Sequence, residues 1–313
     1  MSPYRIDVHT HLVPPFWAEG LKTHGGDPSG WGAPEWSPDQ LIRFMDDEDI
    51  AISILSLTAP GIGGWTGSER VDIARRVNDY GADLVKRRPE RLGYLATLAL
   101  PDVDAGLAEI GRAFDELDAD GVVLHSNFDG VYLGDPKFEP IWKELDRRGA
   151  VVFVHPTTPS TKVLDGIPGP IEDYPADTTR AALDIVLAGH MTRFSACKVI
   201  LSHGGGFLPY AASRFAELKS ALTPARSVDS LYAEMKQFYF DTALTAPSGL
   251  PSLLAFAESG HILFGTDYPY ASEKVSKTFT KKLDDYSDFP AGALKEINEG
   301  GRCLFPRLVK ENS

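Results

Sequence analysis

The sequence predicts a (β/α)8 barrel, a TIM barrel, that forms a single domain over residues 1–313. Short apolar, β-branched runs alternate with amphipathic stretches of helical period, which is typical of a parallel sheet covered by helices. Eight such runs occur in the chain, and this number favours a closed barrel over an open doubly wound sheet. No Gly-x-Gly-x-x-Gly motif opens a helix after the first run, which disfavours dinucleotide binding. No repeat, low-complexity segment or long linker marks a domain boundary.

The periodicity assigns the expected elements in order. The expected strands are residues 6–9, 51–56, 92–97, 121–125, 151–155, 199–203, 238–241 and 261–267. The expected helices are residues 38–47, 68–88, 104–117, 136–148, 178–194, 208–222 and 248–259. Barrel enzymes carry their reactive groups at the C-terminal ends of the strands, so the residues that close these runs are the first candidates for function.

The composition indicates a soluble globular protein with a small-molecule substrate. The chain is 43% hydrophobic and 24% charged. Its formal charge of -13 argues against nucleic acid or an anionic membrane as partner. There is no apolar run of roughly 18 residues and no signal-peptide pattern, so we expect a cytoplasmic location. Because Cys197 and Cys303 form no Cys-x-x-Cys pair, any metal must be held by His and carboxylate.

The first strand ends in His9-Thr10-His11. Residues i and i+2 of a strand share one face, so His9 and His11 project side by side. Pro14 and Pro15 follow shortly after and end the strand, which leaves the pair at its open end. Two neutral imidazoles presented together suit a zinc-class divalent ion.

Other expected strands also end in ligand-type residues. A single strand-end histidine is more often a hydrogen-bonded core residue, but five of the eight histidines close strand runs. His9, His11, His155 and Asp267 would converge at one end of the barrel and leave room for substrate, as in catalytic metal sites. His203 is the extra histidine that could take or give a proton near neutral pH. Asp267 could combine weak coordination with proton transfer.

These motifs resemble the amidohydrolase superfamily over almost the whole chain. The resemblance rests on His9-Thr10-His11, Phe153-Val154-His155-Pro156, Leu201-Ser202-His203-Gly204-Gly205-Gly206 and Gly265-Thr266-Asp267-Tyr268-Pro269. The nearest branch is that of the metal-dependent nonoxidative decarboxylases, which act on aminocarboxymuconate semialdehyde, γ-resorcylate and 6-methylsalicylate. The resemblance implies that His9, His11, His155 and Asp267 bind one Zn or Mn ion. It also implies that His203 is the catalytic histidine.

The resemblance extends to Arg214, eleven residues beyond His203. In the decarboxylase branch an arginine at this offset binds a substrate carboxylate, and it reaches the site of the neighbouring subunit. Arg suits this role because its planar fork pairs bidentately with carboxylate. The alternative is an exposed helix arginine in a surface ion pair. If Arg214 serves a neighbouring site, we expect a homodimer or a dimer of dimers. The glycines after His203 either bring backbone close to the site or make a tight turn.

Departures from the family pattern narrow the expected substrate. The strand that ends at His125 offers no Lys, so one metal is expected rather than the bridged pair of binuclear members. In the muconate semialdehyde enzyme a second substrate arginine precedes an Asn-Cys-Trp segment. The matching stretch here is residues 34–36, and Gly32 stands near the position that the second substrate arginine occupies in that enzyme. Thr157 replaces the aromatic residue after His-Pro. A small aromatic acid with one carboxylate, such as a salicylate-type hydroxybenzoate, therefore fits better than a diacid.

Aromatic residues that follow the strand runs could wall an apolar substrate pocket, or could simply pack against the barrel. The candidates are Phe16, Trp17, Trp65, Phe128 and Tyr268.

The predicted reaction is decarboxylation, with the metal holding the carboxylate and an ortho hydroxyl. Asp267, or His203 through water, would protonate the ring carbon as CO2 leaves. The alternative is hydrolysis of an amide, ester or lactone by metal-activated water, with the same five residues. A metal-stabilised binding or scaffold protein is a third possibility, which an unliganded histidine beside the metal disfavours.

Overall fold

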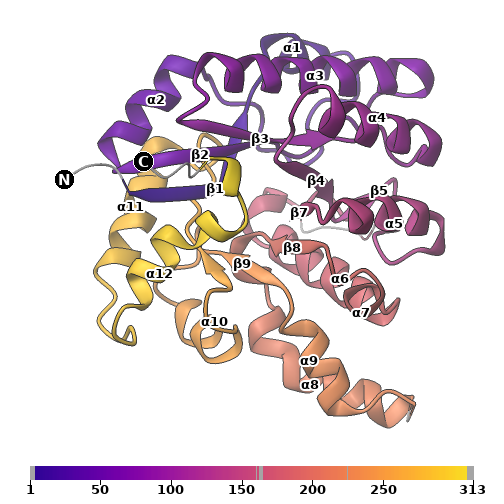
Figure 1. Cartoon of the computed structure of the whole chain (residues 1–313), viewed down its shortest axis with the longest axis vertical. Coiled ribbons are helices and arrows are strands. Elements are labelled where there is room, and N and C mark those ends of the chain that lie inside the picture. Colours follow the sequence, from indigo (N-terminus) through magenta and orange to yellow (C-terminus); the bar gives the residue numbers. More distant parts are fainter. Residues whose placement is uncertain (1–3, 160, 162–164, 224, 309–313) are drawn as a thin grey trace.

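The computed structural model describes residues 4–159, 161, 165–223 and 225–308, so the ends of the predicted domain lie outside the described residues. Eight parallel strands form one sheet in chain order, and helices surround it (Figure 1). The strands are β1 (Arg5–Leu12), β2 (Ile50–Leu57), β3 (Leu92–Thr97), β4 (Gly121–His125), β7 (Val151–His155), β8 (Lys198–Leu201), β9 (Tyr239–Asp241) and β10 (Ile262–Leu263). The predicted (β/α)8 barrel is confirmed.

The first and last strands close the barrel through hydrogen bonds beyond the regular ladder. Val8 N donates to Phe264 O over 3.0 Å, and His11 N donates to Tyr268 O over 2.8 Å. Asp267 N donates to His9 O, also over 2.8 Å. The segment that carries Asp267 is therefore fixed alongside the strand that carries His9 and His11.

The helices cover the outside of the barrel. They are α1 (Pro15–Leu21), α2 (Pro38–Asp47), α3 (Gly67–Arg87), α4 (Val103–Asp115), α5 (Glu139–Arg148), α6 (Asp173–Leu187), α7 (His190–Arg193), α8 (Leu208–Leu222), α9 (Val228–Met235), α10 (Leu250–Phe256), α11 (Glu273–Asp284) and α12 (Ala293–Glu299). A small hairpin of β5 (Asn127–Phe128) and β6 (Val131–Tyr132) follows β4. All seven predicted helices are present, and α2 and α8 have the predicted bounds.

The structure differs from the predicted elements where tertiary contacts override periodicity. The predicted helix 178–194 is two helices, because Gly189 adopts φ +72° and interrupts it. The last strand stops at Leu263 instead of continuing to Asp267. There Thr266 N donates over 3.1 Å to the Asp7 carboxylate of β1 and over 3.4 Å to His9 O of the same strand, in place of a regular backbone ladder. Helices α1, α9, α11 and α12 lie outside the predicted set.

Two apolar cores fill the fold. The larger lies between the strands and the helices. The smaller contains inward residues of the strands, among them Ile6, Val8 and Phe153, with Leu304, Phe305 and Leu308 of the C-terminal segment. The register of β1 on β2 shifts between Asp7 and Thr10. Such an irregularity lets both Val8 and His9 lie inside the barrel, so β1 supplies core at one end and ligands at the other.

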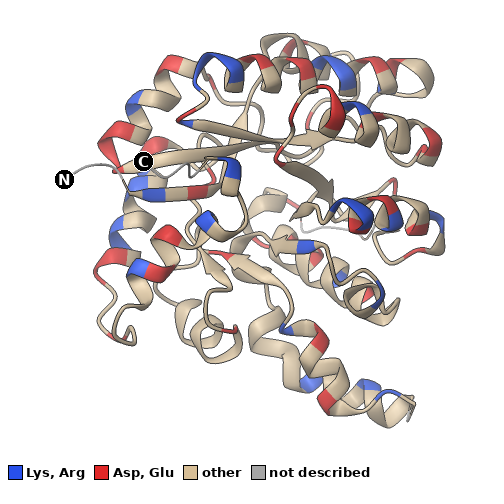
Figure 2. Cartoon of the chain, in the orientation of Figure 1, with Lys and Arg blue, Asp and Glu red and all other residues tan. Residues whose placement is uncertain are grey.

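The helix surfaces carry charge of both signs. In Figure 2 blue and red residues are interspersed along the outer helices. Within the described ranges, no helix combines the length and the apolar character needed to cross a membrane.

Candidate active site

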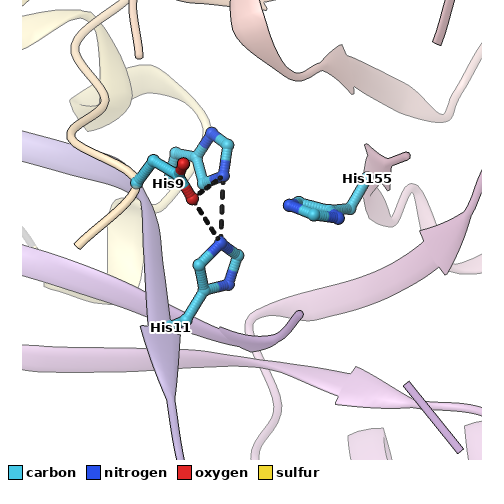
Figure 3. A group of neighbouring side chains, drawn as sticks. His9, His11 and His155 are labelled. Carbon is cyan, nitrogen blue, oxygen red and sulfur yellow. Dashed lines mark hydrogen bonds and ion pairs between the residues drawn. The ribbon is translucent and has the colours of Figure 1, made fainter. Parts of the chain in front are cut away.

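Four buried side chains meet at the C-terminal end of the barrel. His9 and His11 lie on β1, His155 ends β7, and Asp267 follows β10. One donor atom of each lies within 4.8 Å of the corresponding atoms of the others. Figure 3 shows His9 and His11 facing one another and His155 directed toward them from the far side. The structure thus brings together all four predicted ligands.

The donor atoms fit a divalent metal. His9 Nε2 and His11 Nε2 lie 3.1 Å apart, and Asp267 Oδ1 lies 3.3 Å and 3.0 Å from these two atoms. The Nδ1 atoms of His11 and His155 face the backbone oxygens of Ser56 and Pro156. When each Nδ1 donates to its oxygen, each Nε2 carries a lone pair directed inward, which is the tautomer that binds a metal.

The four groups have shifted pKa values in this chain. Burial and the neighbouring histidines hold the pKa of His155 well below its usual range. Burial also lowers the pKa of His11. Burial alone would lower the pKa of His9, but Asp241 and Asp267 outweigh it and raise that pKa to about 10. Burial opposes the shift of Asp267, yet hydrogen bonds with three histidines keep its pKa well below the usual range. Perturbed groups gathered in one cleft are typical of functional sites.

His203 lies beside this cluster without belonging to it. Its Nε2 atom is 3.6 Å from Asp267 Oδ2, and its ring centroid is 4.8 Å from that of His9. Within the described part of the chain its Nδ1 has no hydrogen-bond partner. His203 and Asp267 are therefore close enough to share a proton through one water, as expected for an acid–base pair.

A cavity of about 810 Å³ opens above the cluster and includes His155, His203 and Asp267 in its lining. Its walls come largely from the α1–α2 loop, from residues 170–175 and 203–210, from residues 244–252 and from the segment after Asp267. The aromatic lining residues are Trp31, Tyr174, Phe207, Tyr210 and Tyr270. Among the described lining residues none is Lys or Arg, and the acidic ones are Asp27 and Asp267.

The structure does not bring the predicted pocket residues Phe16, Trp65, Phe128 and Thr157 to this cavity. Phe16 packs on Tyr80 and under the Arg76 guanidinium. Trp65 is buried and stacks on His24. Phe128 and Thr157 line a separate hollow of about 400 Å³.

The other two aromatic candidates are also core residues. Trp17 is fully buried, and its indole N–H donates to Gly61 O over 2.8 Å. Tyr268 stacks on Phe44. An aromatic residue just after a strand is covered by the helix that follows, so its place in the sequence marks packing rather than the cavity wall. Trp31 and Tyr174 come from segments far from any strand end, and periodicity gave no signal for them.

Arg214 lies on α8, exposed and outside the cavity of its own chain. Tyr210 and the N-cap residue Phe207 line the cavity, and Tyr210 stands three residues after Phe207 and four residues before Arg214. Residues at this spacing share one helix face. Arg214 therefore continues the face that begins at the cavity rim.

The glycines after His203 fit both proposed roles, a tight turn and a close approach of the backbone to the site. Gly204, Gly205 and Gly206 all have positive φ, so they make a tight turn that other residues adopt rarely. Gly204 and Gly206 also line the cavity. The turn and the close approach of backbone to the site are thus the same feature.

The chain resembles known decarboxylases over its whole length. The profile of the amidohydrolase family matches residues 6–297. Decarboxylase yanB of Aspergillus niger is 40% identical, over 97% of this chain and 88% of its own. The 6-methylsalicylic acid decarboxylase of Penicillium expansum is 39% identical, over 97% of each chain. These matches confirm the resemblance inferred from the motifs.

A solved structure shares the fold. It is the dihydroxybenzoic acid decarboxylase of Polaromonas sp. JS666, with bound manganese and the inhibitor 2-nitroresorcinol. The two structures superpose with a TM-score of 0.80 over 100% of this chain and 99% of the other, at 22% identity. From the profile match and the two relatives, the chain belongs to the amidohydrolase family.

Proposed function

We propose that this protein is a metal-dependent nonoxidative decarboxylase of a small aromatic acid with one carboxylate, of salicylate type. The main support is the joint placement of the His9, His11, His155 and Asp267 cluster and of His203 around one cavity. The decarboxylases that are its relatives support the reaction class. A divalent ion held by the four residues would supply Lewis acidity for the carboxylate and an adjacent hydroxyl.

The metal is proposed to be Zn or Mn. Three imidazole nitrogens and one carboxylate oxygen form a donor set that suits either ion, and the manganese of the structurally similar decarboxylase supports the second. Elemental analysis of protein purified without added metal should find about one equivalent of Zn or Mn per chain. Variants His9→Ala and His155→Ala should lose it, and retention of full metal by both would rule out this ligand set.

The cavity walls favour an apolar ring. Burial raises the pKa of both Tyr174 and Tyr270, so their hydroxyls remain neutral donors at physiological pH. Most other lining residues are apolar, proline or glycine. We propose that Trp31, Tyr174 and Tyr270 contact the ring, in place of the strand-end aromatics that pack under the helices.

The residues around the cluster supply the proton. The ring carbon that bears the carboxylate is protonated, the bond to the carboxylate then breaks, and its electron pair returns to the ring as CO2 leaves. His203 Nε2 and Asp267 Oδ2 lie 3.6 Å apart, so either residue can deliver the proton and the other can share it. General acid catalysis of this kind contributes roughly 10²- to 10⁴-fold to rate.

The reaction can be tested with 6-methylsalicylate and related hydroxybenzoates. We expect release of CO2 in equal amount to the decarboxylated phenol, and in D2O one deuterium at the carbon that lost the carboxylate. His203→Asn should keep the metal and lose at least about 100-fold in kcat. Asp267→Asn with its metal and full turnover would exclude Asp267 as proton donor. Opening of amide, ester or lactone substrates without CO2 would instead identify a hydrolase.

A homodimer, or a dimer of dimers, is proposed as the active unit. The exposed face of α8 carries large apolar side chains at helical spacing: Phe207, Tyr210, Leu218 and Leu222 are exposed by 44, 83, 54 and 82%. Arg214 stands in the middle of this stripe. A second copy seated here would cover the apolar residues and place Arg214 beside the partner's cavity, where the described lining has no basic side chain of its own.

A further inference from the structure

The three histidines of the cluster differ in what holds their outer nitrogen. His11 and His155 have a main-chain oxygen beside Nδ1, at 3.2 Å and 2.8 Å. His9 has a side-chain carboxylate: Asp241 Oδ2 lies 2.7 Å from its Nδ1. Both His9 and Asp241 are fully buried. His9 therefore relies on a side chain for this contact, whereas His11 and His155 each keep a main-chain acceptor whatever side chain is substituted.

Asp241 also holds the main chain next to His203. Asp241 is the last residue of β9, and its Oδ1 accepts hydrogen bonds from His203 N over 3.0 Å and from Ala243 N over 2.9 Å. His203 adopts φ +53°, a conformation that non-glycine residues rarely adopt. The two oxygens of one carboxylate thus face a ligand histidine on one side and the main chain of the acid–base histidine on the other.

We propose that Asp241 is a positioning residue that fixes His9 in its metal-binding tautomer and holds the backbone of His203. A carboxylate can only accept hydrogen bonds, so His9 Nδ1 must carry a hydrogen. The neutral imidazole, which is the form that binds a metal, then keeps its lone pair on Nε2. Nε2 is the atom that faces His11 and Asp267. This inference rests on the metal site of the proposed function, and it assigns a task to a residue outside the ligand set.

The decisive variant is Asp241→Asn, which keeps the shape of the side chain. The two backbone N–H groups of His203 and Ala243 are fixed donors, so the amide oxygen must turn toward them. The amide nitrogen then donates to His9 Nδ1 and forces the hydrogen onto Nε2, where it blocks the metal. Loss of such a partner typically costs 10- to 100-fold in metal affinity. We expect a loss in this range for Zn, measured by competition with a chelator.

A matched control is Ser56→Ala. The hydroxyl of Ser56 lies 3.1 Å from His11 Nδ1, but the carbonyl of the same residue lies within hydrogen-bond distance too. Removal of the hydroxyl therefore leaves His11 an acceptor. Zn affinity in Ser56→Ala should stay within about threefold of wild type, because the tautomer of His11 is unchanged.

A third variant separates the two tasks of Asp241. In Asp241→Asn the amide oxygen still holds His203 N, so excess Zn should restore most of the wild-type kcat. Asp241→Ala loses both contacts, so excess Zn should leave kcat at least tenfold below that of Asp241→Asn. Equal kcat in the two variants at saturating Zn would overturn the assigned role toward His203.

The tautomer can be observed directly in the wild-type protein. A long-range ¹H–¹⁵N spectrum of the Zn-loaded enzyme should show the hydrogen of His9 on Nδ1. If the spectrum shows no hydrogen on His9 Nδ1, the proposal is overturned even if no Asp241 variant folds. A Zn affinity of Asp241→Asn equal to that of wild type also overturns it. If the wild-type protein binds no divalent metal, the proposed function fails instead, so the two failures are distinguishable.

Discussion

His203 and Asp267 share a backbone conformation that costs free energy. Both have positive φ, +53° and +61°, which for a non-glycine residue costs of order 1–3 kcal/mol and occurs mainly at functional sites. The hydrogen bonds of Asp241 to His203 N and of Asp267 N to His9 O hold the two turns in place. The proposed acid–base pair is thus positioned by main-chain contacts as well as by its side chains.

Asp27 is the residue expected to select against diacids. It lines the cavity, and its carboxylate accepts hydrogen bonds from Ser29 N and Gly32 N, both over 2.9 Å. A second carboxylate on a substrate would meet this charge and no basic group among the described lining residues. Asp27→Asn should therefore raise kcat/KM for a hydroxyisophthalate relative to the matching hydroxybenzoate by about 3- to 10-fold, since repulsion between nearby charges is on the order of 1 kcal/mol.

The exposed carboxylate of Asp39 on α2 supplies the control for this substitution. Asp39→Asn changes the net charge by the same amount but lies outside the cavity lining, so the ratio of the two kcat/KM values should stay at the wild-type value. An unchanged ratio in Asp27→Asn as well would remove Asp27 from substrate selection.

We expect the buried His190 to make the free energy of unfolding depend on pH. Burial against Trp142 and Phe194 lowers the pKa of His190 to about 4, from an ordinary value of 6.5. The unfolded chain therefore takes up the proton first as the pH falls. The contribution of His190 to the free energy of unfolding is complete above about pH 6.5. As the pH falls from 6.5 to 4, the free energy of unfolding decreases by up to about 3 kcal/mol. His190→Gln should flatten the fall in free energy of unfolding over this range.

The wild-type protein is the reference for the acid series. The measurement is denaturant unfolding at several pH values from 7 to 4.5. If His190→Gln loses stability as steeply as wild type, His190 is not a source of acid sensitivity.

At the scale of elements, the turn from β8 into α8 links the site to the surface. Gly206 has φ +62°, and a Cβ there would stand 2.0 Å from the carbonyl oxygen of Pro175. Gly206→Ala should therefore destabilise the fold by at least about 3 kcal/mol, because strain and a clash with fixed backbone add together. Thermal or denaturant unfolding measures the loss.

Gly111 is the matched control for that substitution. It lies within α4, and a Cβ built there meets no described atom within 4 Å. Gly111→Ala should stabilise the fold by about 0.5–1 kcal/mol through helix propensity. A Gly206→Ala protein as stable as wild type would mean that the turn relaxes without cost.

Element identities were predictable where the local pattern and the tertiary environment agree. The strand 151–155 is apolar up to His155 because both of its faces are buried, and helix α8 begins just after a glycine turn. The end of β10 was not predictable, since Thr266 N donates over 3.1 Å to the Asp7 side chain of β1 and only over 3.4 Å to the backbone of that strand. A hydrogen bond between residues 259 positions apart along the chain cannot be predicted from the local sequence.

For the whole molecule, the apolar stripe of α8 predicts self-association. Leu218→Glu together with Leu222→Glu places charge on the exposed face and should convert the proposed dimer to monomer in sedimentation experiments. The monomer should lose activity while it keeps its metal, because the four proposed ligands all belong to one chain. A double variant that remains dimeric would place the interface elsewhere.

Arg214 can be tested by complementation between subunits. Arg214→Ala and His155→Ala should each be inactive, yet a mixture allowed to exchange subunits should regain up to about a quarter of wild-type activity, because a mixed dimer contains one intact site. No recovery, with exchange verified, would confine Arg214 to its own subunit. Arg214→Lys is the conservative companion and should retain part of the activity, since it keeps the charge but loses the bidentate fork.

The sequence by itself determined the strands, the barrel and the residues that form the four-membered cluster. Strand periodicity is local, and a parallel barrel brings all of its strand ends to one rim, so ligand-type residues at those ends had to meet. Only the tertiary structure decided which aromatics wall the cavity and which carboxylate supports His9. Those outcomes depend on how helices and loops pack over the rim of the barrel. Residues far apart in the sequence meet there, and no repeating sequence pattern predicts their contacts.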